Sequence, residues 1–211
     1  MMAELRPDPH AVTDLATLEA IYPLEPTPAS TVKVLDHLSP AYRRIVEATP
    51  FAVLATTGPR GIDCSPRGDA PGFIAVLDDR TVAIPDRRGN NRLDTLRNII
   101  ADPRIGLICL VPGMNEALRL TGRASLTADP ALCERFAVDG KAPATVMVIS
   151  IDTVYFQCAR AILRSRLWDP AVRVARETLP SAGEMLKTAD PSFDGAEYDK
   201  KLPGRQAQTL Y

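Results

Sequence analysis

The chain contains few of the residues on which most catalytic motifs depend. Histidine occurs only at His10 and His37 in 211 residues, and neither belongs to an H-E-x-x-H pattern. A histidine zinc site or a histidine-based triad therefore has almost nothing to build on. The four cysteines, at positions 64, 109, 133 and 158, are too far apart for a C-x-x-C ligand pair. We expect buried thiols, and many classes of hydrolase are disfavoured.

Long apolar runs and an excess of one charge are also missing. No stretch approaches the roughly 18 apolar residues of a membrane span. The first nine residues carry Glu4, Arg6 and Asp8 instead of a signal-peptide apolar stretch. The 25 basic and 26 acidic residues give a net charge of −1, so no global field attracts a polyanion. These features predict a cytoplasmic protein with no nucleic-acid and no membrane partner.

Several nucleotide-binding and hydrolase motifs are absent as well. Gly140-Lys141 resembles the end of a Walker A loop, but residue 142 is alanine, and no G-x-G-x-x-G occurs. The nucleophile elbow G-x-S-x-G is missing too. Nucleotide hydrolysis, a Rossmann site and esterase chemistry are therefore disfavoured.

The composition is that of an ordinary folded protein, with 45% hydrophobic and 24% charged residues. Its length suits one domain with extensions. Five prolines fall within residues 1–30, around one short apolar-periodic helix, which indicates an arm. Residues 169–211 form a tail of different character, with helices expected over 170–179 and 181–187 and a polar end. We predict an arm (1–30), a central domain (31–168) and a tail (169–211).

Apolar spacing within the central domain changes from helical to β-type. Apolar residues from Val32 to Val46 recur at three- and four-residue spacing, which predicts a helix that is bent or split at Ser39-Pro40. Roughly six or seven short strands are expected between residues 51 and 158, with helices over 93–100 and 130–138. Eight segments have β-type spacing and supply these strands: 51–57, 62–67, 72–77, 81–84, 105–111, 117–126, 145–151 and 154–158. Hairpin connections favour a mainly β, antiparallel barrel with flanking helices over a parallel sheet.

Two polar clusters are candidates for chemistry. Residues 85–92 place three arginines, one glycine and two asparagines between a strand and a helix, which suits a phosphate. The alternative is a solvated basic loop. Residues 65–69, Ser-Pro-Arg-Gly-Asp, place Arg67 at a strand end, where it would face a ligand; the alternative is a surface pair between Arg67 and Asp69.

Together these clusters and the short-strand barrel resemble the pyridoxamine 5'-phosphate oxidase-like flavoproteins, and in particular their mycobacterial-type FMN-binding branch. Further matching segments lie between residues 35 and 168 and in the tail. They are Phe51–Thr57, Gly72-Phe73, Thr95–Asn98, Pro112-Gly113, Arg119–Arg123, Phe156–Ala161, Arg164–Trp168, Leu179–Ser181 and Thr209–Tyr211.

The resemblance implies a split β-barrel homodimer that holds two FMN molecules at its interface. Arg67, Arg87, Asn90, Asn91 and Arg92 are carried over as phosphate or ribityl contacts. The backbone of Ser65 and Pro66 is expected against the flavin ring, and Thr95 and Asn98 are contacts of second rank. The sequence departs from the oxidase proper in the spacing of its basic residues and in lacking a C-terminal Arg-His pattern. Vitamin B6 oxidation is therefore not carried over.

A third group follows the last expected strand and would reach the flavin or its substrate. It consists of Gln157, Cys158, Arg160, Arg164 and Trp168. The alternatives are a core thiol for Cys158, a packing anchor for Trp168 and surface or interface pairs for the arginines.

The leading functional hypothesis is an FMN-dependent oxidoreductase, in which a small substrate or a reductant such as NAD(P)H exchanges hydride with the flavin N5. The second is a protein that carries FMN, or haem or a deazaflavin, without turnover. Haem needs an axial ligand, and the two histidines support it poorly. A structural module with a vestigial pocket is the third.

Overall fold

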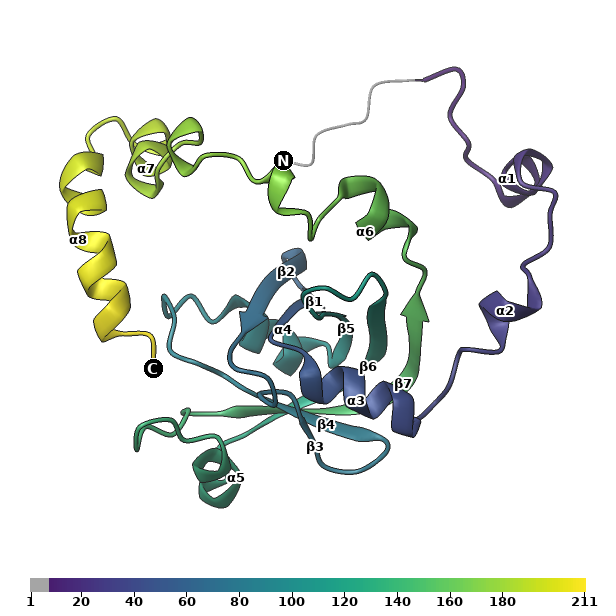
Figure 1. Ribbon diagram of the computed structural model, residues 1–211, viewed down its shortest axis with the longest axis horizontal. Helices are drawn as coiled ribbons and strands as arrows, with labels where there is room; N and C mark the ends of the chain where they lie inside the picture. The colour runs from purple at the N-terminus through teal and green to yellow at the C-terminus, as the bar shows by residue number, and fades with distance from the viewer. Residues whose placement is uncertain (1–7) are drawn as a thin grey trace. The chain divides into compact units, whose positions relative to one another are not determined.

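The computed structural model describes residues 8–211 (Figure 1). The chain divides into two compact units, Met1–Lys33 and Val34–Tyr211. In the first unit, α1 (Leu15–Ile21) begins at Asp14, whose carboxylate accepts the Thr17 N–H, and α2 (Pro28–Thr31) follows. Residues 8–32 are all exposed, so the described part of the arm has no core of its own.

The second unit is built on one seven-stranded antiparallel sheet, in the order β2-β1-β5-β6-β7-β4-β3. Its strands are β1 (Phe51–Gly58), β2 (Gly61–Gly68), β3 (Ala75–Val76), β4 (Thr81–Pro85), β5 (Arg104–Leu110), β6 (Ala117–Thr127) and β7 (Val146–Gln157). The expected antiparallel, mainly β fold with flanking helices is confirmed. The main apolar core lies inside the curved sheet, with Leu54, Leu107, Leu118 and Ile149 among its buried side chains. A smaller cluster of buried residues lies around Cys133 and Phe136.

Tight turns and alternating burial explain the β1–β2 hairpin. Gly61, with φ of 100°, begins the return strand after a two-residue turn. Ala52, Leu54 and Thr56 of β1 are buried, and the residues between them are not. This period-2 pattern is the one that a half-buried strand requires.

The long strand β7 corrects one expectation. Separate strands over 145–151 and 154–158 were expected, but one strand runs from Val146 to Gln157. Its register against β6 shifts between Thr121 and Gly122, where Asp152 is the extra residue. A β-bulge lets the strand bend while the ladder continues.

A second correction concerns the segment before β1. The helix predicted from Val32 to Val46 does not begin until Pro40, where Ser39 Oγ accepts the Tyr42 N–H at 3.2 Å. Residues 32–38 are not part of it; instead the backbone of Leu35 exchanges two hydrogen bonds with that of Val154. Apolar spacing alone did not reveal that this stretch forms a bridge to the sheet.

A third correction concerns β3, which covers only Ala75–Val76 although a strand was expected over 72–77. Gly72 has φ of 94°, and the Phe73 N–H donates to the Ala70 carbonyl. A turn therefore occupies the start of the apolar run. Phe73 and Ile74 are buried without forming a strand.

The remaining helices flank the sheet or form the tail. They are α3 (Pro40–Ala48), α4 (Asp94–Ala101), α5 (Pro130–Arg135), α6 (Arg160–Ser165), the short 3-10 helices η1 (Pro170–Val172) and η2 (Arg176–Thr178), α7 (Ala182–Ala189) and α8 (Gly195–Gln208). The helix α4 packs on β1, β2 and β6. Among residues 8–211, no helix combines the length and apolarity that crossing a membrane requires.

The tail departs from expectation at both ends. The helix predicted over 170–179 is replaced by η1 and η2, whereas α7 confirms the helix expected over 181–187. The polar end was not expected to be helical, yet α8 runs through Pro203. It forms a hairpin with α7. The two helices approach so closely at Gly183 and Gly195 that a Cβ on either glycine would collide with the carbonyl of the other.

Candidate cofactor site

The candidate site begins on the edge strand β2, where Asp63, Ser65 and Arg67 share one face. Their cross-strand partners on β1 are Thr56, Leu54 and Ala52, and all three are buried. Directly paired residues point to the same side of a sheet. The three polar side chains are therefore on the core side of the edge strand and are half-buried.

Arg67 has an unsatisfied polar group on this side. Its Nη1 donates to the Pro66 carbonyl at 3.1 Å, but the buried Nε has no hydrogen-bond partner among residues 8–211. Burial lowers the pKa of Arg67, and the carboxylates of Asp86 and Asp63 oppose that shift. A buried donor left without an acceptor costs about 1–3 kcal/mol, and more when it is charged. An anion is the acceptor that would remove this cost.

Arg67 does not form the surface pair with Asp69 that the sequence left open. Asp69 instead pairs with Arg87, whose Nε donates to the carboxylate at 2.7 Å. Arg87 also donates through Nη1 to the Phe136 carbonyl at 2.6 Å. This ion pair joins the residues that follow β2 and β4, so it holds the two edge regions of the sheet together at one end.

A half-buried carboxyl lies beside these arginines. Asp86 follows β4 directly, and burial raises its pKa while Arg67 lowers it. Its charge offsets part of the charge of Arg67, so the region is not a simple basic patch.

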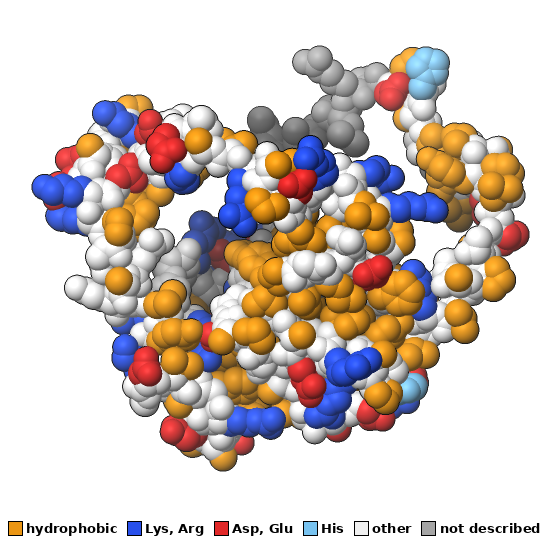
Figure 2. Space-filling model, viewed as in Figure 1, with side chains coloured by type: hydrophobic (Ala, Val, Ile, Leu, Met, Phe, Trp, Pro, Cys, Tyr) orange, Lys and Arg blue, Asp and Glu red, His pale blue; other side chains and the backbone are white. Residues whose placement is uncertain are grey.

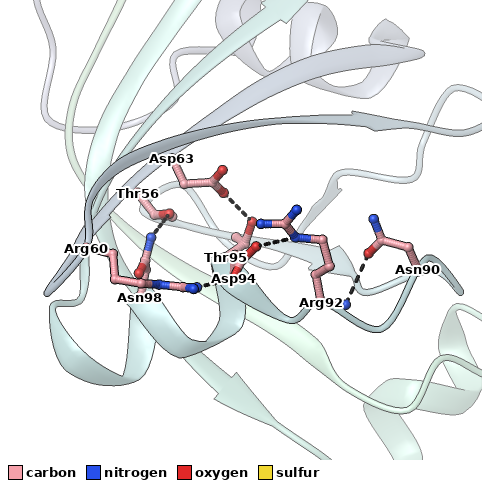
Figure 3. A network of polar contacts seen from close by, with 8 residues as sticks. All are labelled: Thr56, Arg60, Asp63, Asn90, Arg92, Asp94, Thr95 and Asn98. Atoms are coloured by element: carbon pink, nitrogen blue, oxygen red, sulfur yellow. Dashed lines mark hydrogen bonds and ion pairs between the residues drawn. The ribbon is translucent and has the colours of Figure 1, made fainter. Parts of the chain in front are cut away.

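The third arginine, Arg92, belongs to a more exposed network (Figure 3). Its backbone N–H donates to Asn90 Oδ1 at 3.1 Å, and its Nε donates to Asp94 Oδ2 at 2.8 Å. Figure 3 shows Asp94 between Arg92 and Arg60, which pairs with the same carboxylate. A hydrogen bond from Arg92 is the largest influence on the pKa of Asp94 and lowers it; burial opposes this shift, and a hydrogen bond from Arg60 adds to the lowering. The Arg92 side chain is 71% exposed.

Asp94 was not among the residues that the sequence singled out. It could have been identified as an acidic residue in the first turn of the expected helix, because acidic residues stabilise the positive end of the helix dipole. The α4 start has further features that suit an anion. Leu93 precedes the helix in the left-handed conformation without a side-chain cap, and Asn91 is also left-handed and exposed.

The two residues of second rank, Thr95 and Asn98, are buried and hold α4 against the hairpin. Thr95 Oγ1 donates to Asp63 Oδ2 at 2.9 Å, and Asn98 Nδ2 donates to Thr56 Oγ1 at 3.2 Å. A Cβ on Gly58 would overlap the Asn98 side chain. Both residues therefore position α4 relative to β1 and β2.

Within residues 8–211, the structure places each of the three expected arginines beside a different aspartate and does not pair them with one another. Arg67 lies near Asp86 and Asp63, Arg87 is bound to Asp69, and Arg92 is bound to Asp94. Ser65 and Pro66 lie beside Arg67 on opposite faces of β2, with Ser65 half-buried and Pro66 exposed.

The residues at and after the end of β7 make these contacts. Trp168 Nε1 donates to the Met114 carbonyl at 2.7 Å, which fits the packing-anchor interpretation. Gln157 lies near Arg119 in β6, while Arg160 and Arg164 are exposed on α6. Cys158 is exposed at the end of β7, so its interpretation as a core thiol is wrong.

The general expectation of buried thiols is also wrong for Cys64, which lies on the outer face of β2. Cys109 and Cys133 are buried as expected. Burial raises the pKa of Cys109 to about 12, although a hydrogen bond with Thr49 opposes that shift. Among the described residues, no cluster of three potential metal ligands occurs.

The face of the sheet opposite Arg67 is apolar and exposed. Phe51, Ile62 and Ile108 share it by strand register, and they are 41%, 81% and 40% exposed. Figure 2 shows hydrophobic side chains gathered over the middle of the second unit, where Figure 1 places β1, β5 and β6. An exposed apolar face of this kind marks an interaction surface.

Comparisons with known proteins place this geometry in context. No curated protein matches the chain. HupZ from Group A Streptococcus is a similar solved structure, with 16% identity, a TM-score of 0.47 and coverage of 56% of this chain and 93% of its own. A candidate pyridoxamine 5'-phosphate oxidase of Lactobacillus delbrueckii has 18% identity, a TM-score of 0.44 and coverage of 57% and 95%. General Stress Protein 26 of Bacillus anthracis has 16% identity, a TM-score of 0.41 and coverage of 54% and 88%.

The family is shown by sequence. The model of the pyridoxamine 5'-phosphate oxidase family matches residues 38–158, which cover more than half of the chain and run from the residues before α3 to the end of β7. The matched region contains all nine residues singled out for the cofactor. The chain therefore belongs to the pyridoxamine 5'-phosphate oxidase family.

Proposed function

We propose that the protein binds FMN and acts as an FMN-dependent oxidoreductase. Members of its family are often flavin-binding oxidoreductases, and the match covers the whole sheet. The protein need not provide an acid–base pair for such chemistry, because flavin carries its own redox capacity. The scarcity of histidine is therefore compatible with this function.

The observation that supports the proposal most is the buried Nε of Arg67, which lacks a partner among residues 8–211. A phosphate has several acceptor oxygens and the opposite charge, so it satisfies a guanidinium better than any neutral group. Arg67 also lies on a strand that is fixed by Thr95 and α4 through Asp63. A rigid strand supplies the pre-organised donor that anion binding needs.

Other residues would hold the remaining parts of FMN. Asn90, Asn91 and Arg92 lie in the loop before α4, whose first N–H groups favour an anion. The exposure of Arg92 and its pairing with Asp94 predict a smaller contribution than that of Arg67. Arg87 is fixed by Asp69, and the backbone of Ser65 and Pro66 would lie beside the flavin ring. When bound, FMN supplies hydride transfer at N5.

We also propose that the functional form is a homodimer. The apolar face around Phe51, Ile62 and Ile108 has the character of a surface that a second copy covers. A twofold interface places the same patch against itself.

The experiment that tests FMN binding is a titration followed by flavin fluorescence. Arg67→Ala should weaken binding by about 10- to 150-fold, because a charge-assisted hydrogen bond is worth about 1.5–3 kcal/mol. Arg92→Ala should weaken it less. Arg97→Ala, on the exposed side of α4, is the control and should leave the Kd unchanged. Equal affinity of wild type and Arg67→Ala would refute the site.

A second experiment separates an enzyme from a carrier. Mass spectrometry of small molecules released from the native protein identifies the resident cofactor, and FMN is expected rather than haem or a deazaflavin. Anaerobic stopped-flow mixing of the FMN complex with NADH or NADPH should then bleach the flavin absorbance. FMN that stays oxidised with every reductant offered would favour the carrier. Vitamin B6 oxidation is not part of the proposal.

A further inference from the structure

Tyr211 contacts the candidate site from 124 residues beyond Arg87 in the sequence. Its hydroxyl donates to Asp69 Oδ1 at 2.7 Å. The Arg87 guanidinium carbon lies 5.3 Å from the centre of its ring. Its backbone carbonyl accepts a hydrogen bond from Lys141 Nζ at 3.3 Å. Three separate contacts therefore fix Tyr211 beside the Asp69–Arg87 pair.

Asp69 is the residue through which these contacts act. Its side chain is 4% exposed, and both carboxylate oxygens are occupied. Oδ1 accepts from the Ala70 N–H and from Tyr211, while Oδ2 accepts from Arg87. Removing the Tyr211 hydroxyl would take one of three donors from the buried Asp69 carboxylate. The position of that carboxylate, and with it the position of Arg87, would then be less well fixed.

We propose that Tyr211 is a positioning residue for the cofactor site, because its hydroxyl and ring together fix the Asp69–Arg87 pair and so the direction in which Arg87 offers its free donors. Arg87 uses Nε for Asp69 and Nη1 for Phe136, and no hydrogen bond of Nη2 is found within residues 8–211. A guanidinium that is held at two nitrogens and stacked on a ring loses little freedom on binding an anion. The inference rests on the proposed function, which places the FMN phosphate at these arginines.

The tail reaches this position without broad packing on the sheet. Its helix α8 packs chiefly on α7, and the pair is held by contacts of its own. Asp199 accepts the Gly183 N–H at 2.7 Å and pairs with the Ser181 hydroxyl. Residues 209–211 are therefore held on the sheet by the contacts of Tyr211 more than by helix packing. The side-chain contacts among them are made with Asp69 and Arg87.

The charged groups around Asp69 and Tyr211 predict that the Asp69–Arg87 ion pair depends on pH. Asp69 faces Arg87 and Tyr211, and Tyr211 in turn faces Lys141 and Asp139. Burial raises the pKa of Asp69, but hydrogen bonds from Tyr211, Ala70 and Arg87 outweigh burial and lower it. Without the Tyr211 hydroxyl, Asp69 should protonate at a higher pH, and Arg87 should lose its partner there.

The first test uses the protein without added cofactor. Hydrogen exchange of the Arg87 Nε–H is followed by ¹⁵N NMR, with the signal assigned by its loss in Arg87→Lys. Tyr211→Phe keeps the ring and removes the hydroxyl, whereas Tyr211→Ala removes both. Exchange should be slow in wild type, faster in Tyr211→Phe and fastest in Tyr211→Ala. The acid limb of protection should move to higher pH in Tyr211→Phe.

The matched control is Tyr198→Phe. This tyrosine also belongs to the tail and also contacts an arginine, since Arg205 donates to its hydroxyl at 2.7 Å, but it lies within α8. Its exchange and pH profile should match wild type. Equal Arg87 protection in wild type, Tyr211→Phe and Tyr211→Ala would overturn the proposal.

The second test measures FMN binding by the same variants. Tyr211→Phe should raise the Kd about three- to tenfold, in the range expected for one hydrogen bond, and Tyr198→Phe should not change it. If wild type binds FMN and Tyr211→Ala binds equally well, the proposal fails while the proposed function stands. If wild type does not bind FMN, the proposed function fails and the positioning role for a cofactor fails with it, even where the exchange rates show that Tyr211 orders Arg87.

Discussion

Two arginines of the site, Arg67 and Arg87, differ in what satisfies their charge. Arg87 has a buried carboxylate, a carbonyl and an aromatic ring as partners. Arg67 has one carbonyl and a buried Nε without a partner among the described residues. A folded protein tolerates such a group where a ligand completes it, because the cost of burial is recovered on binding. Arg87 is therefore held in place by its protein partners, whereas Arg67 keeps a buried donor that we propose a ligand completes.

The ion pair of Asp69 predicts how stability responds to acid. The folded pKa of Asp69 lies below the ordinary value of 3.8, so its contribution is present above that pH and is lost as the pH falls through the lower folded value. Asp69→Asn should cost on the order of 2 kcal/mol near neutral pH, because Arg87 is left half-paired. Urea denaturation from pH 6 to about 2.5 should show the gap to wild type narrowing below pH 4. A gap that is constant over this range would contradict the assignment. Asp152→Asn, at an exposed position, is the control.

At the scale of elements, the sequence predicted strands well where burial alternates and poorly where tertiary contacts decide. Strand β1 was predicted within one residue at its end, since the buried Ala52, Leu54 and Thr56 alternate with less buried neighbours. The α8 helix was missed because Pro203 and Gly204 disfavour a helix on propensity, while packing of Gly195 on Gly183 stabilises it. Residues 32–38 were assigned to a helix because their bridge to Val154 lies far along the chain.

The site shows the same division. Arg67, Asn90 and Arg92 were singled out from local pattern, because a strand end and a helix start are visible in sequence. The partners of Arg87 were not, since Phe136 and Tyr211 come from elements that only the fold brings to it. Local sequence identifies a charged side chain, but which partners it has depends on residues far along the chain.

The close contact of the two tail helices gives a test at the element scale. Gly183→Ala should open the α7–α8 hairpin, because the new Cβ meets the Gly195 carbonyl and the Asp199 carboxylate. Backbone amides of α7 and α8 should then exchange at least tenfold faster, while those of β1 and β6 stay protected. Gly204→Ala is the matched control, since nothing lies within 4 Å of its Cβ and alanine favours the helix. Unchanged exchange in Gly183→Ala would show that the helices are not held by this contact.

At the scale of the whole molecule, we assign separate roles to the two faces of the β1–β2 hairpin, cofactor binding to the face with Arg67 and assembly to the apolar outer face. The inner face places Arg67 at the end of the core, and the outer face presents Phe51, Ile62 and Ile108 to solvent. A second copy on the outer face would cover the strand that carries Arg67. Assembly and cofactor binding would then depend on the same β-hairpin.

Thiol labelling tests this arrangement. Cys64 lies on the outer face, while Cys158 is exposed at the end of β7. In a homodimer Cys158 should react quickly with a thiol reagent and Cys64 slowly. Ile108→Glu should separate the subunits to a mass near 22.9 kDa and expose Cys64. Ile100→Glu, at a position 78% exposed on α4, should change neither property. Fast labelling of Cys64 in wild type at micromolar concentration would show that this face is uncovered.

The central claim is that Arg67 recognises the phosphate of FMN, and a comparison of FMN with riboflavin tests it most directly. Riboflavin has the same ring and ribityl chain but no phosphate, so the ratio of the two Kd values isolates the phosphate contact. Wild type should prefer FMN by at least tenfold. Arg67→Ala should lose most of that preference through weaker FMN binding, with riboflavin affinity unchanged. An undiminished preference for FMN in Arg67→Ala would contradict the account.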